Sequence, residues 1–217
     1  MQLVITPEAR ALGIDACMAI VSGATISNKS NPLEKLKKEA VQQLQRINLE
    51  EDPVLKAYRD LHEKCGLNGV MPPSQHLLSL VQRNGRLPNI NTVVDCYNLI
   101  SAVTRLSIGA HDTAHLRGDL IFKLTDGHEH YIPLGETEPV AVLPGEYACM
   151  DAEKIICRMD IKQCAETRIT KETREFVIYV QGNEVTVYDY LMSGLRQVCN
   201  LLVEICGGQY QIIEAAK

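Results

Sequence analysis

Aromatic residues are scarce in this chain, which has no tryptophan and only two phenylalanines among its 217 residues. Aliphatic side chains must therefore build most of the interior. Long apolar runs are missing as well, because the longest, residues 16–24, is too short and too rich in small residues to cross a bilayer. The chain also lacks a basic segment ahead of an apolar stretch near Met1, so no signal peptide is expected. We expect no membrane partner and a cytoplasmic location.

Positive charge is in short supply: 22 lysines and arginines face 27 aspartates and glutamates, for a net charge of −5. A general nucleic-acid binder normally carries a basic excess, so that class is disfavoured unless a local basic patch exists. The sequence also lacks a Gly-x-Ser-x-Gly elbow, a phosphate-binding loop of the Walker type and a Gly-x-Gly-x-x-Gly fingerprint. No cofactor is expected, and motif spacing by itself names no reaction.

The eight cysteines form no Cys-x-x-Cys pair and no compact spacing. Reduced, mostly buried thiols are the favoured interpretation. A zinc or redox site is the less favoured alternative. The cysteines are Cys17, Cys65, Cys96, Cys149, Cys157, Cys164, Cys199 and Cys206.

The first half of the chain has a helical pattern. Asn-Pro at 31–32 and Asp-Pro at 52–53 are typical helix starts. We expect helices at residues 31–47, 53–65 and 75–83. A further helix is expected within residues 86–112, with Asn89 or Asn91 as its N-cap. Gly109 should end it and leave His111 and Asp112 in the turn beyond.

The second half has the pattern of strands. Residues 120–124 and 130–132 are expected to form a hairpin around a turn at 125–127. Further strands are expected at 139–143, 147–150, 154–158 and 176–180, followed by a helix at 185–205 and an edge strand at 211–213. We therefore predict an α+β fold in which helices cover a sheet. Residues 1–217 should form a single domain, with a helix-rich part (1–85), a core (86–181) and a C-terminal helix that packs on it (182–217).

Two polar groupings are candidates for a site. Asp95, Asn98 and His111 lie on or just after the helix in 86–112, where they could line a pocket, although helix-edge polar residues more often face solvent or cap neighbours. Residues 154–174 hold six Lys/Arg against three Asp/Glu. Arg158 or Arg168 could bind a phosphate or carboxylate there. The alternative is a solvated hairpin whose charges pair across strands.

Histidines raise the question of a metal. His111 and His115 form one closely spaced pair and His128 and His130 another, but a metal site would need both pairs to converge. Surface or pocket-rim histidines are the favoured interpretation, and no metal is expected.

An ordered set of short motifs gives the clearest signal. It comprises Val94-Asp95-x-x-Asn98, then Asp112, Gly145-Glu146 with Asp151 downstream, Cys157-Arg158, and Thr167-x-Ile169-Thr170-x-x-Thr173. The set resembles the tRNA-editing domain in the beta chain of phenylalanyl-tRNA synthetase, and still more the freestanding bacterial proteins that carry this domain alone. The resemblance implies a layered β-sandwich, or mixed sheet, with flanking helices. It also implies hydrolysis of the ester between a wrong amino acid and tRNA by a positioned water.

Three positions depart from the synthetase pattern. Tyr97 stands where the family has threonine, Gly109 where it has histidine, and Tyr179 near the glutamate that recognises tyrosine. Tyrosine specificity is therefore not expected. We expect instead a bulkier, more charged pocket that binds a different ligand.

The function predicted from the sequence is a freestanding tRNA-editing-like protein. It would bind the aminoacylated end of tRNA, hydrolyse mischarged aminoacyl-tRNA in trans, and so serve translation quality control. The alternatives are a non-catalytic binder of a free amino acid or similar anion and, less favoured, a metal-dependent hydrolase. The substrate-binding residues should meet in one cavity between the helix within 86–112 and the basic segment. They are Asn91, Asp95, Asn98, His111, Asp112, Arg158, Asp160, Gln163 and Arg168.

Overall fold

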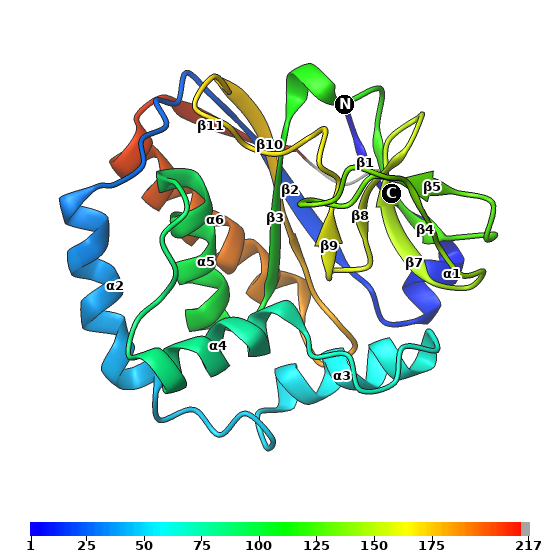
Figure 1. Ribbon diagram of the computed structural model, residues 1–217, viewed down its shortest axis with the longest axis horizontal. Coiled ribbons are helices and arrows are strands. Elements are labelled where there is room, and N and C mark those ends of the chain that lie inside the picture. Colours follow the sequence, from blue (N-terminus) through cyan, green and yellow to red (C-terminus); the bar gives the residue numbers. More distant parts are fainter. Residues whose placement is uncertain (214–217) are drawn as a thin grey trace.

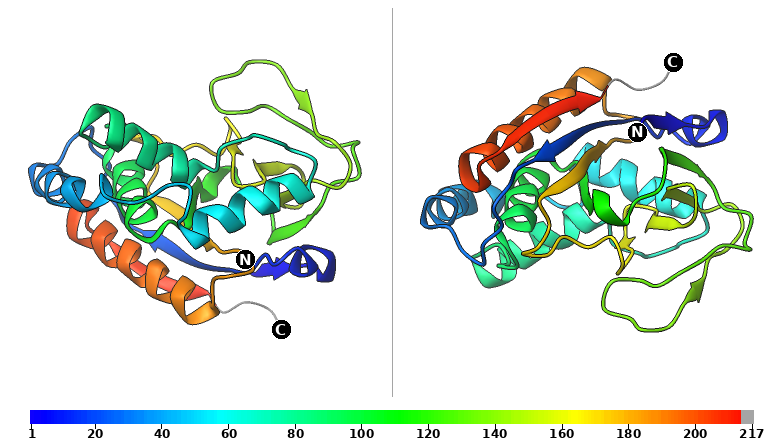
Figure 2. Two further views of the ribbon diagram at one scale, coloured as in Figure 1. Left: turned by 90° about the horizontal axis from the view of Figure 1, so that it is seen from below. Right: turned by 90° about the horizontal axis from the view of Figure 1, so that it is seen from above.

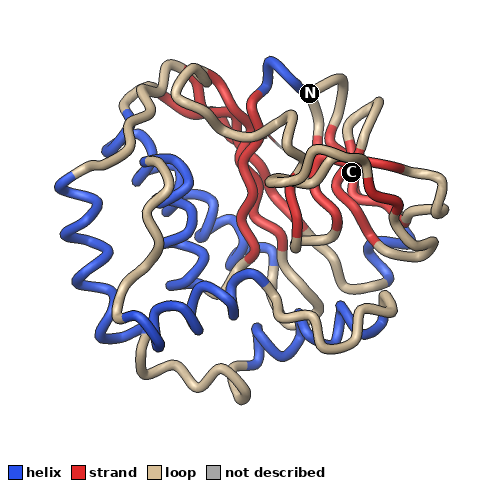
Figure 3. Tube along the Cα trace, in the orientation of Figure 1, coloured by secondary structure: helices blue, strands red, loops and turns tan. Residues whose placement is uncertain are grey.

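The computed structural model describes residues 1–213 and contains two β-sheets that pack against each other, with helices over the outer face of one sheet (Figures 1 and 2). Figure 3 shows most helices on one side of the molecule and most strands on the other. The α+β prediction, a mixed sheet with flanking helices, is confirmed. The prediction of one domain over 1–217 stays a prediction, and residues 214–217 lie outside the described part.

The first sheet is antiparallel throughout and has four strands. In spatial order they are β11 (Gln209–Ile213), β2 (Ala16–Ser22), β10 (Glu175–Gln181) and β3 (Ser107–Asp112). The second sheet has five strands, of which β1 and β4 are parallel neighbours. Their order is β1 (Leu3–Ile5), β4 (Leu120–Leu124), β7 (Tyr147–Met150), β8 (Ile155–Arg158) and β9 (Lys162–Gln163).

A short hairpin of β5 (His130–Tyr131) and β6 (Val140–Ala141) lies beside the second sheet. The segment after β5 runs antiparallel to the segment after β9 and is hydrogen-bonded to it. Leu134 N donates to Gln163 O at 2.7 Å, and Ala165 N donates to Ile132 O at 2.8 Å. These bonds fix the hairpin next to the basic segment 154–174.

The first five α-helices begin at a polar cap or a proline, whereas the last begins after Val187 without a side-chain cap. Ser30, Asp52 and Asn91 each accept a backbone N–H of a first helical turn, and Asn91 does so from Val94 N at 3.0 Å. The helices are α1 (Pro7–Ala11), α2 (Asn31–Leu44), α3 (Pro53–Lys64), α4 (Pro73–Asn84), α5 (Thr92–Thr104) and α6 (Tyr188–Cys206), with a 3-10 turn η1 (Thr113–His115).

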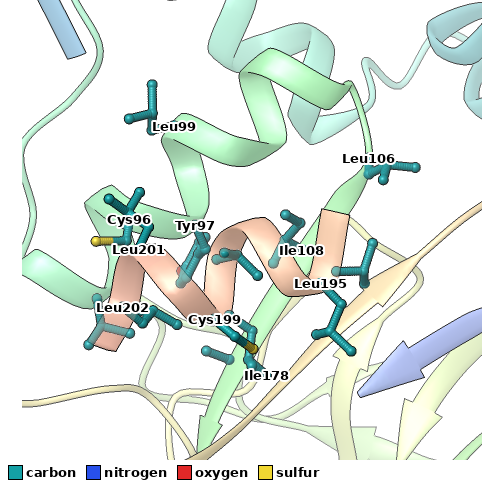
Figure 4. Close-up of a cluster of buried hydrophobic side chains, with 14 of the residues drawn as sticks. Cys96, Tyr97, Leu99, Leu106, Ile108, Ile178, Leu195, Cys199, Leu201 and Leu202 are labelled. Atoms are coloured by element: carbon teal, nitrogen blue, oxygen red, sulfur yellow. The ribbon is translucent and has the colours of Figure 1, made fainter. Parts of the chain in front are cut away.

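Alternation along β10 separates two hydrophobic cores. Ile178 and Val180 face α5 and α6, where Figure 4 shows Ile178 close to Leu195 and Cys199. Val177 and Tyr179 face the second sheet, where they join Phe122 and other large side chains. Because successive strand residues point to opposite faces, the four-stranded sheet is the partition between the helical layer and the five-stranded sheet.

The helix expected within 86–112 begins as predicted, with Asn91 as its N-cap, but was extended too far towards Gly109. It ends at Thr104, and Arg105 takes a left-handed conformation with φ 62°. Residues 107–112 then form β3, in which all six residues are buried. The prediction of a turn containing His111 and Asp112 was wrong, because pairing with β10 buries this segment in a sheet.

The expected hairpin around residues 125–127 was also wrong. β4 pairs with β1 and β7, whereas β5 pairs with β6. Thr125 instead bonds to a distant segment, since its hydroxyl donates to Leu143 O at 2.6 Å. All eight cysteines are buried and unpaired, as predicted. Across residues 1–213, no helix is both long enough and apolar enough to span a bilayer.

Candidate ligand-binding site

The polar residues of α5 have structural partners. Asn91 caps the helix, and Asp95 accepts from Lys37 Nζ at 3.0 Å and from Ile90 N at 2.8 Å. Both members of the Lys37–Asp95 ion pair are buried, so this pair ties α2 to the start of α5. Asn98 is half-buried on α5. Capping and ion pairing therefore account for two of the three α5 residues that the sequence proposed for ligand binding.

His111 and Asp112 connect β3 to the segment before β10. His111 is fully buried, and its Nδ1 lies 2.7 Å from the Thr167 hydroxyl. Its ring stacks on Tyr179 with centroids 5.8 Å apart and planes 13° apart, and its Nε2 has no partner in the described residues. Burial lowers the pKa of His111 to about 3, despite the opposing charge of Asp151, so the ring is neutral. Asp112 accepts from the Thr173 hydroxyl at 2.6 Å.

Arg158 is the centre of a charge-assisted pair. Its Nε and one terminal nitrogen each lie 2.6 Å from an oxygen of Glu146, whose side chain is fully buried. This two-bond geometry is the strong form of an arginine–carboxylate contact. Gly145-Glu146 and Cys157-Arg158, two separate motifs in the sequence, thus form one structural unit.

Arg168 differs from Arg158. Its side chain is exposed and donates to Ala165 O at 2.8 Å, with no carboxylate partner in residues 1–213. Lys154 has two carboxylates within reach, Asp151 at 3.3 Å and Glu166 at 3.5 Å. Arg168 therefore has N–H donors that remain available to a ligand.

Asp160 belongs to a buried polar network that includes a residue the sequence analysis missed. Its Oδ1 lies 2.6 Å from His62 Nε2 and accepts from the Tyr147 hydroxyl at 3.2 Å. Gln181 Nε2 donates to that hydroxyl at 2.9 Å. The side chains of His62 and Asp160 are both fully buried. The available signal was weak: His62 lies on the apolar face of α3 with Tyr58 and Leu61, a pattern typical of core residues.

The His62–Asp160 pair joins helix α3 to the turn that follows β8. Burial on its own would lower the pKa of His62, but the hydrogen bond and charge of Asp160 outweigh it and raise that pKa. Met159, next to Asp160, is held at φ 50°, which is uncommon for a residue other than glycine. The pair therefore fixes the turn 158–162 against α3 and the loop that follows α3.

The predicted residues do not share a single cavity. α5 packs on one face of the four-stranded sheet, and Arg158 lies in the five-stranded sheet on the other face (Figure 1). In residues 1–213, neither Asp95 nor Asn98 has a hydrogen bond or ion pair with the segment 154–174. The structure brings together Arg158, Asp160 and Gln163 on one turn, and His111 and Asp112 with Thr167 and Thr173.

Two hollows lie beside the basic segment. The first, here called the apolar cavity, has a volume of about 340 Å³. Its lining residues are Leu67, Tyr131, Pro133, Val140 and Ile161, with Arg158, Lys162 and Glu136. The second, here called the cationic cavity, has a volume of about 480 Å³. Its lining residues are His130, Tyr131, Ile132, Pro139, Lys154, Cys164, Ala165, Glu166 and Arg168.

Comparison with known proteins gives the family. Residues 63–207 match the B3/4 domain, which is more than half of the chain. The chain belongs to the B3/4 domain family. Its fold is similar to an N-terminal fragment of the phenylalanyl-tRNA synthetase beta subunit from Pyrococcus horikoshii, with a TM-score of 0.57 and 15% identity. The match covers 99% of this chain and 51% of the fragment, so the chain spans about half of that structure's length. No curated protein sequence matches.

Gly109 and Tyr179, two positions at which the sequence was expected to depart from the synthetase pattern, are direct partners across β3 and β10. A Cβ atom at position 109 would lie 2.7 Å from Cζ and from the hydroxyl of Tyr179. The tyrosine ring thus occupies the space that a side chain at 109 would need. The absence of a side chain at Gly109 therefore makes room for the Tyr179 ring in this part of the sheet.

The histidines of this B3/4 domain are dispersed. His111 is buried, and His115, His128 and His130 are exposed. Within residues 1–213, no three His, Cys, Asp or Glu side chains are arranged to hold a metal ion. The metal-dependent alternative therefore has no cluster in the described part to act through.

Proposed function

We propose that this B3/4 domain binds the aminoacylated end of a tRNA at the two cavities beside the basic segment and hydrolyses a mischarged ester there. The observation that carries the proposal is the exposed Arg168 guanidinium beside a cavity with apolar walls. Such an arginine suits a backbone phosphate, and phosphate contacts supply much of the affinity of nucleic-acid binders. The fold shared with the synthetase fragment supports the same assignment.

Hydrolysis at this site would depend on positioning. The buried thiol of Cys164 lines the cationic cavity, but no base is hydrogen-bonded to it in residues 1–213. A water held close to the ester carbon would serve as the attacking group, adding its oxygen to the acyl carbon while the ribose oxygen leaves with a proton. The protein's part is to hold the ester still and to exclude alternative orientations.

The experiment is a deacylation and binding assay with the purified protein and a panel of mischarged tRNAs. We expect at least one member to be bound and hydrolysed, with Arg168→Ala weakening binding and reducing its salt dependence. Arg46→Ala is the matched control, since Arg46 is also exposed but lies just beyond the end of α2, away from the two cavities. A complete panel that is neither bound nor hydrolysed would refute the proposal.

The second candidate is a binder of a free amino acid. The small volume of the apolar cavity, about 340 Å³, favours it, because that is near the lower limit for a ligand pocket. A thermal-shift screen separates the two candidates. Stabilisation by free amino acids without any effect of tRNA would support the binder.

A further inference from the structure

The two large β-sheets have four edge strands, and three of these edges are buried or covered within residues 1–213. Beside β3, Asp112 N donates to Thr167 O at 2.9 Å, and all six residues of this strand are buried. Beside β9, Leu134 N donates to Gln163 O. The edge strand β1 has only three residues, of which two are buried. The fourth edge, β11, is different.

β11 is paired on one side only. Its five residues pair with β2, and in the described part of the chain no other segment is hydrogen-bonded to its backbone. Gln209 and Gln211 are exposed, and Tyr210, Ile212 and Ile213 are half-buried. Figure 2 shows β11 at the outer margin of the molecule, beside α6. The outward N–H and C=O groups of such a strand can pair with a further strand.

The composition of β11 leaves this edge unprotected. Proteins usually protect an exposed edge with charged side chains, a proline or a bulge. Residues 207–213, Gly-Gly-Gln-Tyr-Gln-Ile-Ile, contain neither charge nor proline, and the register with β2 is unbroken. A neutral strand can lie antiparallel to a second copy of itself without placing like charges opposite each other. Such self-pairing has a two-fold axis, which is the commonest symmetry of protein oligomers.

We propose that two copies of this chain dimerise through β11, which joins their four-stranded sheets into one continuous sheet. Gln211, the middle residue of β11, lies at or next to the two-fold axis. A standard interface buries about 800 Å² on each partner, more than the edge of a five-residue strand offers, so α6 contributes as well. Asn200 Oδ1 accepts from the Tyr210 hydroxyl at 2.9 Å, which places the exposed α6 face of Arg196 and Asn200 beside β11.

The experiment has two measurements on the whole chain. Sedimentation velocity over a range of micromolar concentrations should show a monomer–dimer equilibrium. Hydrogen exchange in dilute and concentrated samples locates the interface, because backbone amides that become paired exchange more slowly. The amides of β11 should gain protection in the concentrated sample, and those of β3, at the opposite edge of the same sheet, should not change.

Charges introduced at Gln211 test the two-fold pairing. Gln211→Lys and Gln211→Glu should each raise the dissociation constant of the dimer at least about tenfold, because like charges then meet across the axis. A mixture of the two variants should recover the dimer, because opposite charges then meet. Gln42→Lys and Gln42→Glu, at an exposed position on α2, are the matched controls and should leave the dissociation constant unchanged. Gln209, which is also exposed, takes the same substitutions if a Gln211 variant does not fold.

Each remaining outcome would overturn the proposal. A chain that stays monomeric at every concentration would leave this edge to an extended segment of another protein. A dimer that persists in both charge variants, or that their mixture does not recover, would have its interface elsewhere. None of these results depends on ligand binding at the two cavities, so the proposed function is tested separately.

Discussion

His62 and His111 are both fully buried, yet their surroundings favour opposite charge states. His62 places Nε2 2.6 Å from Asp160 and Nδ1 3.2 Å from Val70 O, so both ring nitrogens face acceptors, as a protonated imidazole requires. His111 has one hydroxyl partner and one nitrogen without a partner, and it stacks on an aromatic ring. The contrast shows that burial alone does not decide the charge of a histidine here. The charge is decided by the hydrogen-bond partner that a distant segment supplies.

The largest effect on the difference between His62 and His111 is expected from removing the Asp160 carboxylate. Asp160→Ala leaves His62 and the Tyr147 hydroxyl without their shared acceptor in a fully buried place. We expect a loss of about 3–5 kcal/mol in the free energy of unfolding, the usual result of breaking a buried pair. Urea denaturation measures it, and Glu138→Ala, at an exposed loop position between β5 and β6, should change stability by less than about 0.5 kcal/mol. Equal effects of the two substitutions would contradict the structural role of the pair.

The His62–Asp160 pair also shows what the sequence could not predict. Helix starts followed from local chemistry, as at Asp52 and Asn91, where one side chain and its neighbours decide the structure. The ordered motifs predicted the architecture, since they carry the family pattern. His62 and Asp160 are 98 residues apart, and no local pattern relates them. Their contact depends on how α3 packs against the turn after β8.

Gly109 was recognised from the sequence as a structurally important position, but for the wrong reason. It was interpreted as the end of a helix, which is a common local role of glycine. In the structure it lies within β3, opposite Tyr179, whose ring needs the space that a side chain would take. Glycine is needed at position 109 because of Tyr179, a partner far along the chain. The expectation of one shared cavity was wrong for the same reason, because the four-stranded sheet separates α5 from the segment that carries Arg158.

Lowering the pH should reduce the stability contributed by His111 but not the stability contributed by His62. The folded pKa of His111, about 3, is below the unfolded value, so its neutral form contributes stability that is present above about pH 6.5 and lost as the pH falls. Between pH 7 and pH 4 the loss should be about 3 kcal/mol from this one residue. The pKa of His62 is raised, so its contribution is complete below about pH 6.5 and is lost as the pH rises through its folded value.

His111→Phe isolates this acid effect, because phenylalanine keeps a ring against Tyr179 but takes up no proton. Stability is measured by denaturation at several pH values. The variant should lose less stability than the parent between pH 7 and pH 4. Identical pH profiles would show that His111 does not remain neutral in the fold.

A smaller effect is expected from removing the Thr167 hydroxyl, which His111 contacts. This change tests whether burial or the hydroxyl keeps His111 neutral. Thr167→Val keeps the shape of a fully buried side chain but deletes the group that lies 2.7 Å from Nδ1. We expect a loss of about 1–2 kcal/mol, since a buried polar atom is left without its partner. Thr137→Val, at an exposed position, is the control. Because burial is the main reason that the pKa of His111 is low, an NMR titration of the Thr167 variant should still find the ring neutral at pH 5. A His111 ring that becomes protonated near its ordinary pKa in this variant would instead make the hydroxyl, and not burial, the group that keeps it neutral.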